Sequence, residues 1–231
     1  DIAMRLNAGL GALGLTLLLL TASKLFDLKT AWVTVILIGL CSDWWYESRG
    51  FLSEVGAGAL LMACVYFADD RRPYLSALAL GASLLFRPPS ILGLPLWGLS
   101  VWKADDRRRA ALSGVLIAAG AAALAAYNWI RFGSPTSTGY GAEAFSSNLL
   151  LGLQGLLLTP GRSVFVYSPI LLLALVGAAP LYRRHRPFAV AVLASIAAYV
   201  FTMAAWHSWD GGWTWGSRLL TPILPLVGLL C

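Results

Sequence analysis

Apolar runs separated by short polar segments recur along the whole chain. A membrane-crossing helix needs about 20 apolar residues, or fewer where its ends reach the interface, and about nine runs fit this description. They are residues 6–23, 30–44, 52–68, 73–87, 89–102, 110–128, 164–182, 187–206 and 217–231. The pattern predicts an all-α, polytopic membrane bundle that forms one transmembrane domain over residues 1–231. The fourth and fifth runs are short and meet at Arg87-Pro88-Pro89, so a re-entrant pair is an alternative there.

Composition narrows the class of protein. The chain is 58% hydrophobic and 12% charged, whereas soluble proteins carry about 25% charged residues. This excludes a soluble domain, a disordered chain, a collagen and a coiled coil. The three cysteines, Cys41, Cys64 and Cys231, have no metal-ligand spacing and form no disulfide framework, so we expect no metal site built on them.

The basic residues are distributed unevenly between the two sides of the expected bundle. When the spans alternate, 11 of the 17 Lys and Arg residues fall in one set of connections and six in the other. Cytoplasmic loops of membrane proteins are enriched in Lys and Arg, so the first set is expected to be cytoplasmic. The net charge of +6 therefore indicates topology and not nucleic-acid binding.

The outer connections contain the candidate chemistry, including an interfacial segment over residues 129–163. Seven of the ten tryptophans lie on this side, although an aromatic belt would place them at both interfaces. Trp209, Trp213 and Trp215 can stack on a sugar ring or lie along a polyprenyl chain, with anchoring in the belt as the alternative. His207 is expected to be a polar cavity residue, because a lone histidine makes no metal site.

Single arginines stand at the ends of apolar runs on this outer side. Charges near hydrocarbon are costly and usually face a partner or a wet cavity, and the planar arginine fork matches a phosphate. We therefore expect a lipid-linked phosphate to bind here, with snorkelling to headgroups as the alternative. The arginines are Arg49, Arg87, Arg131, Arg162 and Arg218.

Three outer carboxylates are candidates for a general base or a cation ligand. Asp43 and Asp210 lie in outer connections, and Glu54 begins the third apolar run, where it can face a helix N-terminus or the cavity. The alternative is ion pairing with nearby arginines, Glu47 with Arg49 and Asp210 with Arg218.

At these outer segments the chain resembles bacterial GT-C superfamily membrane glycosyltransferases, among them the polyprenyl-phosphate-dependent relatives of the protein mannosyltransferases and the lipid A aminoarabinose transferase. Four stretches carry the resemblance, in the family's order. They are Gly39 to Glu54, Gly81 to Pro88, the pair Tyr127 to Gly141 and Gly155 to Pro169, and Trp209 to Pro225. Each motif is modest alone, and the ordered set is fairly specific.

The resemblance implies an inverting transferase of the bacterial inner membrane that moves a sugar from polyprenyl phosphate to an extracytoplasmic acceptor. It assigns the five outer arginines to the lipid phosphate and Tyr140, with Glu54, Asp210 and the tryptophans, to the sugar and acceptor cavity. Membrane lipids are further expected partners, and a divalent cation is an optional cofactor.

The family's catalytic acid lies in a first outer loop, and the chain is expected to begin after that loop, as the core portion of a larger domain. The rival interpretation is a non-catalytic GT-C-like subunit that packs with other membrane subunits. A transporter is less favoured, because no span carries paired acids or broken-helix symmetry.

Overall fold

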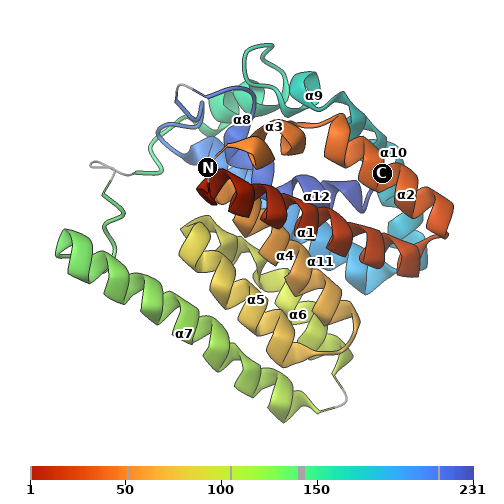
Figure 1. The fold of residues 1–231 in the computed structure, drawn as a ribbon, viewed down its shortest axis with the longest axis horizontal. Helices are drawn as coiled ribbons and strands as arrows, with labels where there is room; N and C mark the ends of the chain where they lie inside the picture. The colour runs from red at the N-terminus through yellow and green to blue at the C-terminus, as the bar shows by residue number, and fades with distance from the viewer. Residues whose placement is uncertain (1, 51, 105, 140–143, 213) are drawn as a thin grey trace.

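The computed structural model describes residues 2–50, 52–104, 106–139, 144–212 and 214–231 (Figure 1). Within these residues every regular element is a helix, which confirms the all-α class. The elements are α1 (Ile2–Leu25), α2 (Leu28–Leu40), α3 (Asp43–Arg49), α4 (Ser53–Asp69), α5 (Pro73–Phe86), η1 (Pro88–Gly93), α6 (Leu94–Lys103), α7 (Arg107–Phe132), α8 (Leu149–Leu157), α9 (Val164–Tyr167), η2 (Pro169–Leu172), α10 (Leu173–Arg184), α11 (Arg186–Ala205), η3 (Arg218–Ile223) and α12 (Leu224–Gly228).

Three of the described helices are long and apolar enough to cross a membrane: α1, α7 and α11. A fourth crossing results if α3 and α4, which are bent by 118° relative to each other, form one broken span. The other expected spans correspond to shorter or broken helices. Pro88 and Pro89 begin a 3-10 turn between α5 and α6, and Pro169 and Pro222 lie in the turns that precede α10 and α12. Proline lacks the N–H that a continuous helix needs.

Local sequence explains most helix boundaries. Side chains of Asp27, Ser42, Asp106, Asn148 and Ser163 accept hydrogen bonds from the first turns of α2, α3, α7, α8 and α9, as helix caps do. Gly133 ends α7 with a φ of 71°, a conformation that glycine adopts without steric cost.

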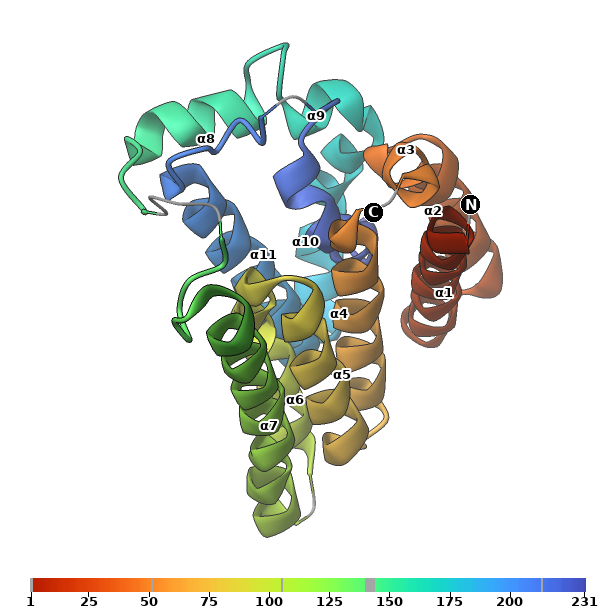
Figure 2. The same cartoon turned by 60° about the vertical axis from the view of Figure 1, so that its left-hand side comes forward.

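Helix α4 forms the centre of the fold. It packs against α1, α5, α6 and η3, and nearly all its residues from Glu54 to Val65 are buried. Helix α11 packs against both α6 and α8. Helix α7 lies at the edge, where it contacts α5 and α6 (Figure 2). Only 17% of its most apolar window is buried, as expected of a helix that faces lipid.

Two glycines set the distance between α5 and α7. A Cβ atom on Gly81 would lie 2.7 Å from the carbonyl oxygen of Leu116, and one on Gly120 would overlap the carbonyl oxygen of Gly81. The two backbones therefore touch, as in helix pairs of membrane proteins that associate through small residues.

Two ion pairs join the helix ends that carry the basic connections. Lys24 at the end of α1 pairs with Asp70, and Lys103 at the end of α6 pairs with Asp69. The end of α4 thus contacts the ends of α1 and α6. The distribution of basic residues predicts that these three helix ends lie on the same side of the membrane.

Candidate functional site

A cavity of about 700 Å³ lies at the end of α5 where α5 meets η1. Its wall combines basic, aromatic and hydroxyl side chains with apolar ones. The residues that carry its chemistry are Arg87, Arg218, His207, Trp206, Phe145 and Ser53. Segments from α4, α5, the connection after α7, α11 and η3 therefore meet here, although they are far apart in the sequence.

Glu54 holds the two cavity arginines in place. Its side chain is fully buried, and Arg218 Nε donates to Glu54 Oε1 at 2.5 Å. Arg87 Nη1 lies 3.4 Å from the same oxygen. One carboxylate thus partly balances two guanidinium groups, and the trio has a net charge of +1. The Arg87 and Arg218 side chains are 17% and 23% exposed, so both retain access to the cavity.

The segment that carries Arg218 is fixed by a second buried acid. Asp43 Oδ2 accepts from the backbone N–H of Ser217 at 3.2 Å and from its hydroxyl at 3.3 Å. The backbone N–H of Asp43 donates to Ser168 Oγ at 2.9 Å. Asp43 therefore anchors α3 to the start of η3.

Arg162 supports the same segment from the other side. Its guanidinium donates to the backbone carbonyl oxygens of Gly212, Thr214 and Gly216. These bonds provide hydrogen-bond donors for carbonyl groups of a segment that is not helical. Arg162 therefore positions the loop before Arg218 and does not line the cavity.

Two of the five expected phosphate ligands, Arg87 and Arg218, are together at the cavity. Arg49 is exposed on α3, with its guanidinium carbon 5.9 Å from the ring centre of Trp45. Arg131 is exposed near the end of α7, where it donates to the Tyr127 hydroxyl. The structure does not place either of these side chains on the cavity wall.

The two alternative ion pairs do not form. Arg218 pairs with Glu54 and not with Asp210, whose carboxylate accepts from Ser208 at 3.1 Å on the exposed surface. Glu47 is fully buried, and neither of its carboxylate oxygens has a hydrogen-bond partner. Burial, assisted by the charge of Glu54, raises the pKa of Glu47 to about 7.

The aromatic residues are divided among three places. His207 lies on the cavity wall, with its ring centre 4.6 Å from that of Trp206. Trp209 packs over Gly155 of α8, because a Cβ on that glycine would overlap the indole ring. Trp215 is 60% exposed and stacks edge-on against Tyr167, at 5.5 Å between ring centres. Tyr140 and Trp213 lie outside the described residues.

Several wall residues were not singled out from the sequence. Phe145 and Trp206 form an edge-to-face pair at 5.2 Å, and Thr136 and Thr138 add hydroxyl groups. Thr136 and Thr138 come directly after the sequence Arg-Phe-Gly-Ser-Pro. Their place in the stretch Tyr127 to Gly141, which carries part of the family resemblance, could have identified them as wall residues. Within the described ranges, no three His, Cys, Asp or Glu side chains are arranged to hold a metal ion.

The site is therefore a partly basic, partly aromatic cavity with two arginines oriented by a buried glutamate. Comparison with known proteins does not extend this description. No family model, no curated protein and no solved structure matches the chain.

Proposed function

We propose that this protein is a multi-pass glycosyltransferase of the bacterial inner membrane, with a GT-C-like bundle, that binds a polyprenyl-phosphate sugar in the cavity at Arg87 and Arg218. The observation that carries the proposal is this arginine pair, which shares one carboxylate oxygen of Glu54. Its net positive charge and several N–H donors suit a phosphate group.

The rest of the cavity suits the two other parts of such a donor. Phe86, Ile91 and Leu219 provide apolar surface for the polyprenyl chain. Trp206 and His207 offer ring faces and a polar group for the sugar. In the transfer step, a base takes the proton of the acceptor hydroxyl, the oxygen attacks the anomeric carbon, and polyprenyl phosphate leaves with the electrons of the broken bond.

The rival function is a non-catalytic GT-C-like subunit that binds the lipid within a larger membrane complex. One observation favours it: none of the described residues on the cavity wall is an acid. Asp43 and Glu54 are engaged with Ser217 and the arginines, and Asp210 is exposed away from the wall. Transfer therefore needs a base from one of two sources. Either Glu54 releases an arginine and accepts the proton of the acceptor hydroxyl, or an acid outside the described part of the wall does so.

Donor binding tests the arginine assignment. Arg87→Lys keeps the charge but loses the planar fork, and a charge-assisted hydrogen bond contributes about 1.5–3 kcal/mol. We expect roughly ten- to hundredfold weaker binding of polyprenyl-phosphate mannose in nanodiscs. Arg131→Lys, at an exposed arginine away from the cavity, is the matched control and should bind as the parent does. Equal binding by Arg87→Lys and the parent would refute the assignment.

Sugar transfer separates the enzyme from the subunit. The parent chain and Glu54→Gln are compared in nanodiscs with a panel of polyprenyl-phosphate sugars and peptide or lipid acceptors. Transfer by the parent supports the enzyme. Donor binding without transfer, together with stable copurification in a complex, supports the subunit.

A further inference from the structure

Three aromatic side chains from distant parts of the sequence meet on the surface outside the cavity at Arg87 and Arg218. The ring centre of Trp215 lies 6.5 Å from that of Tyr46 in α3 and 5.5 Å from that of Tyr167 in α9. Trp215 and Tyr46 are 60% and 52% exposed, and Tyr167 is half-buried. All three belong to the described part of the chain, and none of them lines the cavity. The proposed donor binding therefore makes no use of these three residues, which we call the aromatic cluster.

The backbone that carries Trp215 is held on both sides. Arg162 donates to the carbonyl oxygens of Thr214 and Gly216, the two residues next to Trp215. Arg218 follows three residues after Trp215 in the same segment. The exposed indole therefore has a defined position relative to Arg218, and whatever binds the aromatic cluster also positions that arginine.

The aromatic cluster continues into exposed apolar helix faces. Tyr46 lies in α3, which follows α2, and Tyr167 comes just before η2 and α10. Both α3 and α9 lie at the upper end of the molecule in Figure 1 and in Figure 2. The other ends of α2 and α10 are basic, with Lys29 in α2 and Arg183 and Arg184 in α10. Between these ends, the side chains that are 46–74% exposed include Trp32, Val33, Ile36, Leu40, Leu172, Leu173, Leu175 and Val176. An apolar face with aromatic residues at one end and basic residues at the other is typical of a surface that lies against a bilayer.

We propose that the aromatic cluster lies in the headgroup layer of the outer leaflet and thereby holds Arg218 near the level of the lipid phosphates. Rings of Trp and Tyr favour this layer because they are amphipathic. Trp45, 52% exposed, and the exposed Arg49 extend the same side of α3, with the Arg49 guanidinium carbon 5.9 Å from the Trp45 ring centre. A cation at this level can pair with lipid phosphates. A soluble glycan would leave the faces of α2 and α10 uncovered, whereas a bilayer covers them together with the cluster. The inference rests on the membrane placement given under Proposed function, but not on sugar transfer.

The depth of Trp215 in a bilayer tests this surface. The full chain is labelled with fluorotryptophan and placed in phosphatidylcholine nanodiscs, and Trp215→Phe identifies the Trp215 fluorine resonance by its loss. Relaxation of this resonance is measured with a nitroxide on the lipid headgroup, with a nitroxide at the end of an acyl chain, and with a soluble gadolinium chelate. Trp44 lies in the same helix as Tyr46 but is 1% exposed, so its resonance is the buried control.

We expect the headgroup nitroxide to broaden the Trp215 resonance more than the other two probes do, and to broaden the Trp44 resonance less. Strongest broadening by the soluble chelate would show that the cluster faces water, as a surface for a glycan or a soluble protein would, and would overturn the proposal. Strongest broadening by the acyl-chain nitroxide would place the cluster in the hydrocarbon core and would overturn it as well. The measurement involves no sugar donor, so its result does not depend on the proposed transfer.

Donor binding tests the consequence for Arg218. Trp215→Ser leaves the cavity wall intact, since Trp215 does not line it. We expect this variant to bind long-chain polyprenyl-phosphate mannose in nanodiscs about two- to tenfold more weakly, the range for loss of one aromatic pair. It should bind a water-soluble short-chain analogue in detergent as the parent does, because no bilayer sets the depth of that donor. Trp102→Ser, at a 68% exposed tryptophan near the end of α6, is the matched control and should leave both affinities unchanged.

The two donors separate anchoring from direct contact. Equal weakening of both by Trp215→Ser would mean that Trp215 contacts the donor itself, and would overturn its role in holding Arg218 at the phosphate level. A parent chain that binds neither donor would refute the proposed function, and the depth measurement would still decide where the aromatic cluster lies.

Discussion

Buried carboxylates determine how the site at Arg87 and Arg218 is built. Asp43 and Glu54 have partners in the segment 217–218, which holds that segment against α3 and α4. Glu47 lies near both acids, and neither of its carboxylate oxygens has a hydrogen-bond partner. An unpaired buried charge is expensive, so the structure favours the protonated form of Glu47.

This state of Glu47 predicts a pH dependence. The folded protein holds the proton up to about pH 7, whereas the unfolded chain releases it near its ordinary value of 4.5. The unfolded state therefore binds fewer protons in this window, and Glu47 lowers the free energy of unfolding as pH rises, by at most about 1.4 kcal/mol per pH unit. Glu47→Gln stays neutral, so it should gain stability over the parent between pH 5 and 7 and keep that gain above pH 7.

Thermal unfolding of both proteins in detergent from pH 5 to 8 measures this difference. Asp210→Asn, at an exposed acid, should follow the parent at every pH. A Glu47→Gln difference that stays constant across the range would contradict the buried, protonated side chain.

At the scale of single residues, sequence patterns predicted part of the site. Arg87 and Arg218 were predicted because lone charges beside apolar runs need a partner, and Glu54 because it starts a run. The pattern could not reveal that Glu54 holds both arginines, since 164 residues separate Glu54 from Arg218. Arg162 bonds carbonyl groups about 50 residues away, and no local signal distinguishes this role from phosphate binding.

At the scale of elements, close helix contacts explain how the peripheral helix α7 is attached. Its contact with α5 depends on Gly81 and Gly120, whose backbones touch. The apolar runs located these helices to within a few residues, since run 110–128 corresponds to Arg107–Phe132 and run 73–87 to Pro73–Phe86. The runs predicted the break at Pro88, but they did not predict that Pro169 and Pro222 divide a run into a short turn and a helix.

Substitution at this contact has a predicted effect. Gly120→Ile places a branched side chain against the Gly81 carbonyl, and overpacking of this kind costs about 1–3 kcal/mol. We expect a lower unfolding midpoint in detergent and easier proteolysis of α7. Gly98→Ala is the control, because a Cβ on Gly98 meets no atom within 4 Å; it should stabilise by up to about 1 kcal/mol. An unchanged midpoint for Gly120→Ile would mean that α7 does not depend on this contact.

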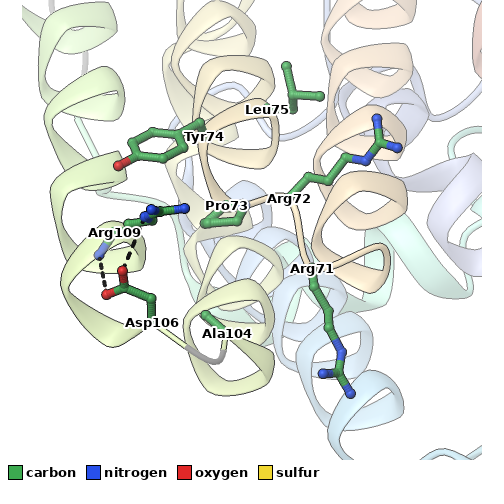
Figure 3. A pocket seen from close by; sticks show the side chains of 8 residues that line it. All are labelled: Arg71, Arg72, Pro73, Tyr74, Leu75, Ala104, Asp106 and Arg109. Carbon is green, nitrogen blue, oxygen red and sulfur yellow. Dashed lines mark hydrogen bonds and ion pairs between the residues drawn. The ribbon is translucent and has the colours of Figure 1, made fainter.

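At the scale of the whole molecule, two cavities stand at opposite ends of the same helix pair. The cavity at Arg87 and Arg218 combines two arginines with aromatic rings, and a second cavity, lined by Arg71, Arg72 and Arg109, lies at the other ends of α5 and α7 (Figure 3). The distribution of basic residues assigns these ends to opposite sides of a membrane.

Cysteine labelling tests this orientation. Cys41, Cys64 and Cys231 are first replaced by alanine, and single cysteines are introduced at the exposed positions Thr136 and Arg107. An impermeant thiol reagent added to intact cells should label the first and not the second, because Lys and Arg mark the cytoplasmic side. After the cells are permeabilised, the reagent should also label the cysteine of Arg107→Cys, which shows that this position is reactive. The reverse pattern in intact cells would invert the orientation.

The long separation between Glu54 and Arg218 has a consequence for biosynthesis. A ribosome must add 164 residues after Glu54 before its closest partner exists, and 174 after Asp43 before Ser217 is made. Before that point, Glu54 lies in an apolar helix, and of its two arginine partners in the folded protein only Arg87 has been synthesised. Uncompensated buried charge costs several kcal/mol, so we expect the helices around Glu54 to pack tightly only after the segment 217–218 has been made. We therefore expect chains stalled before this segment to be more accessible to membrane proteases than chains that contain it.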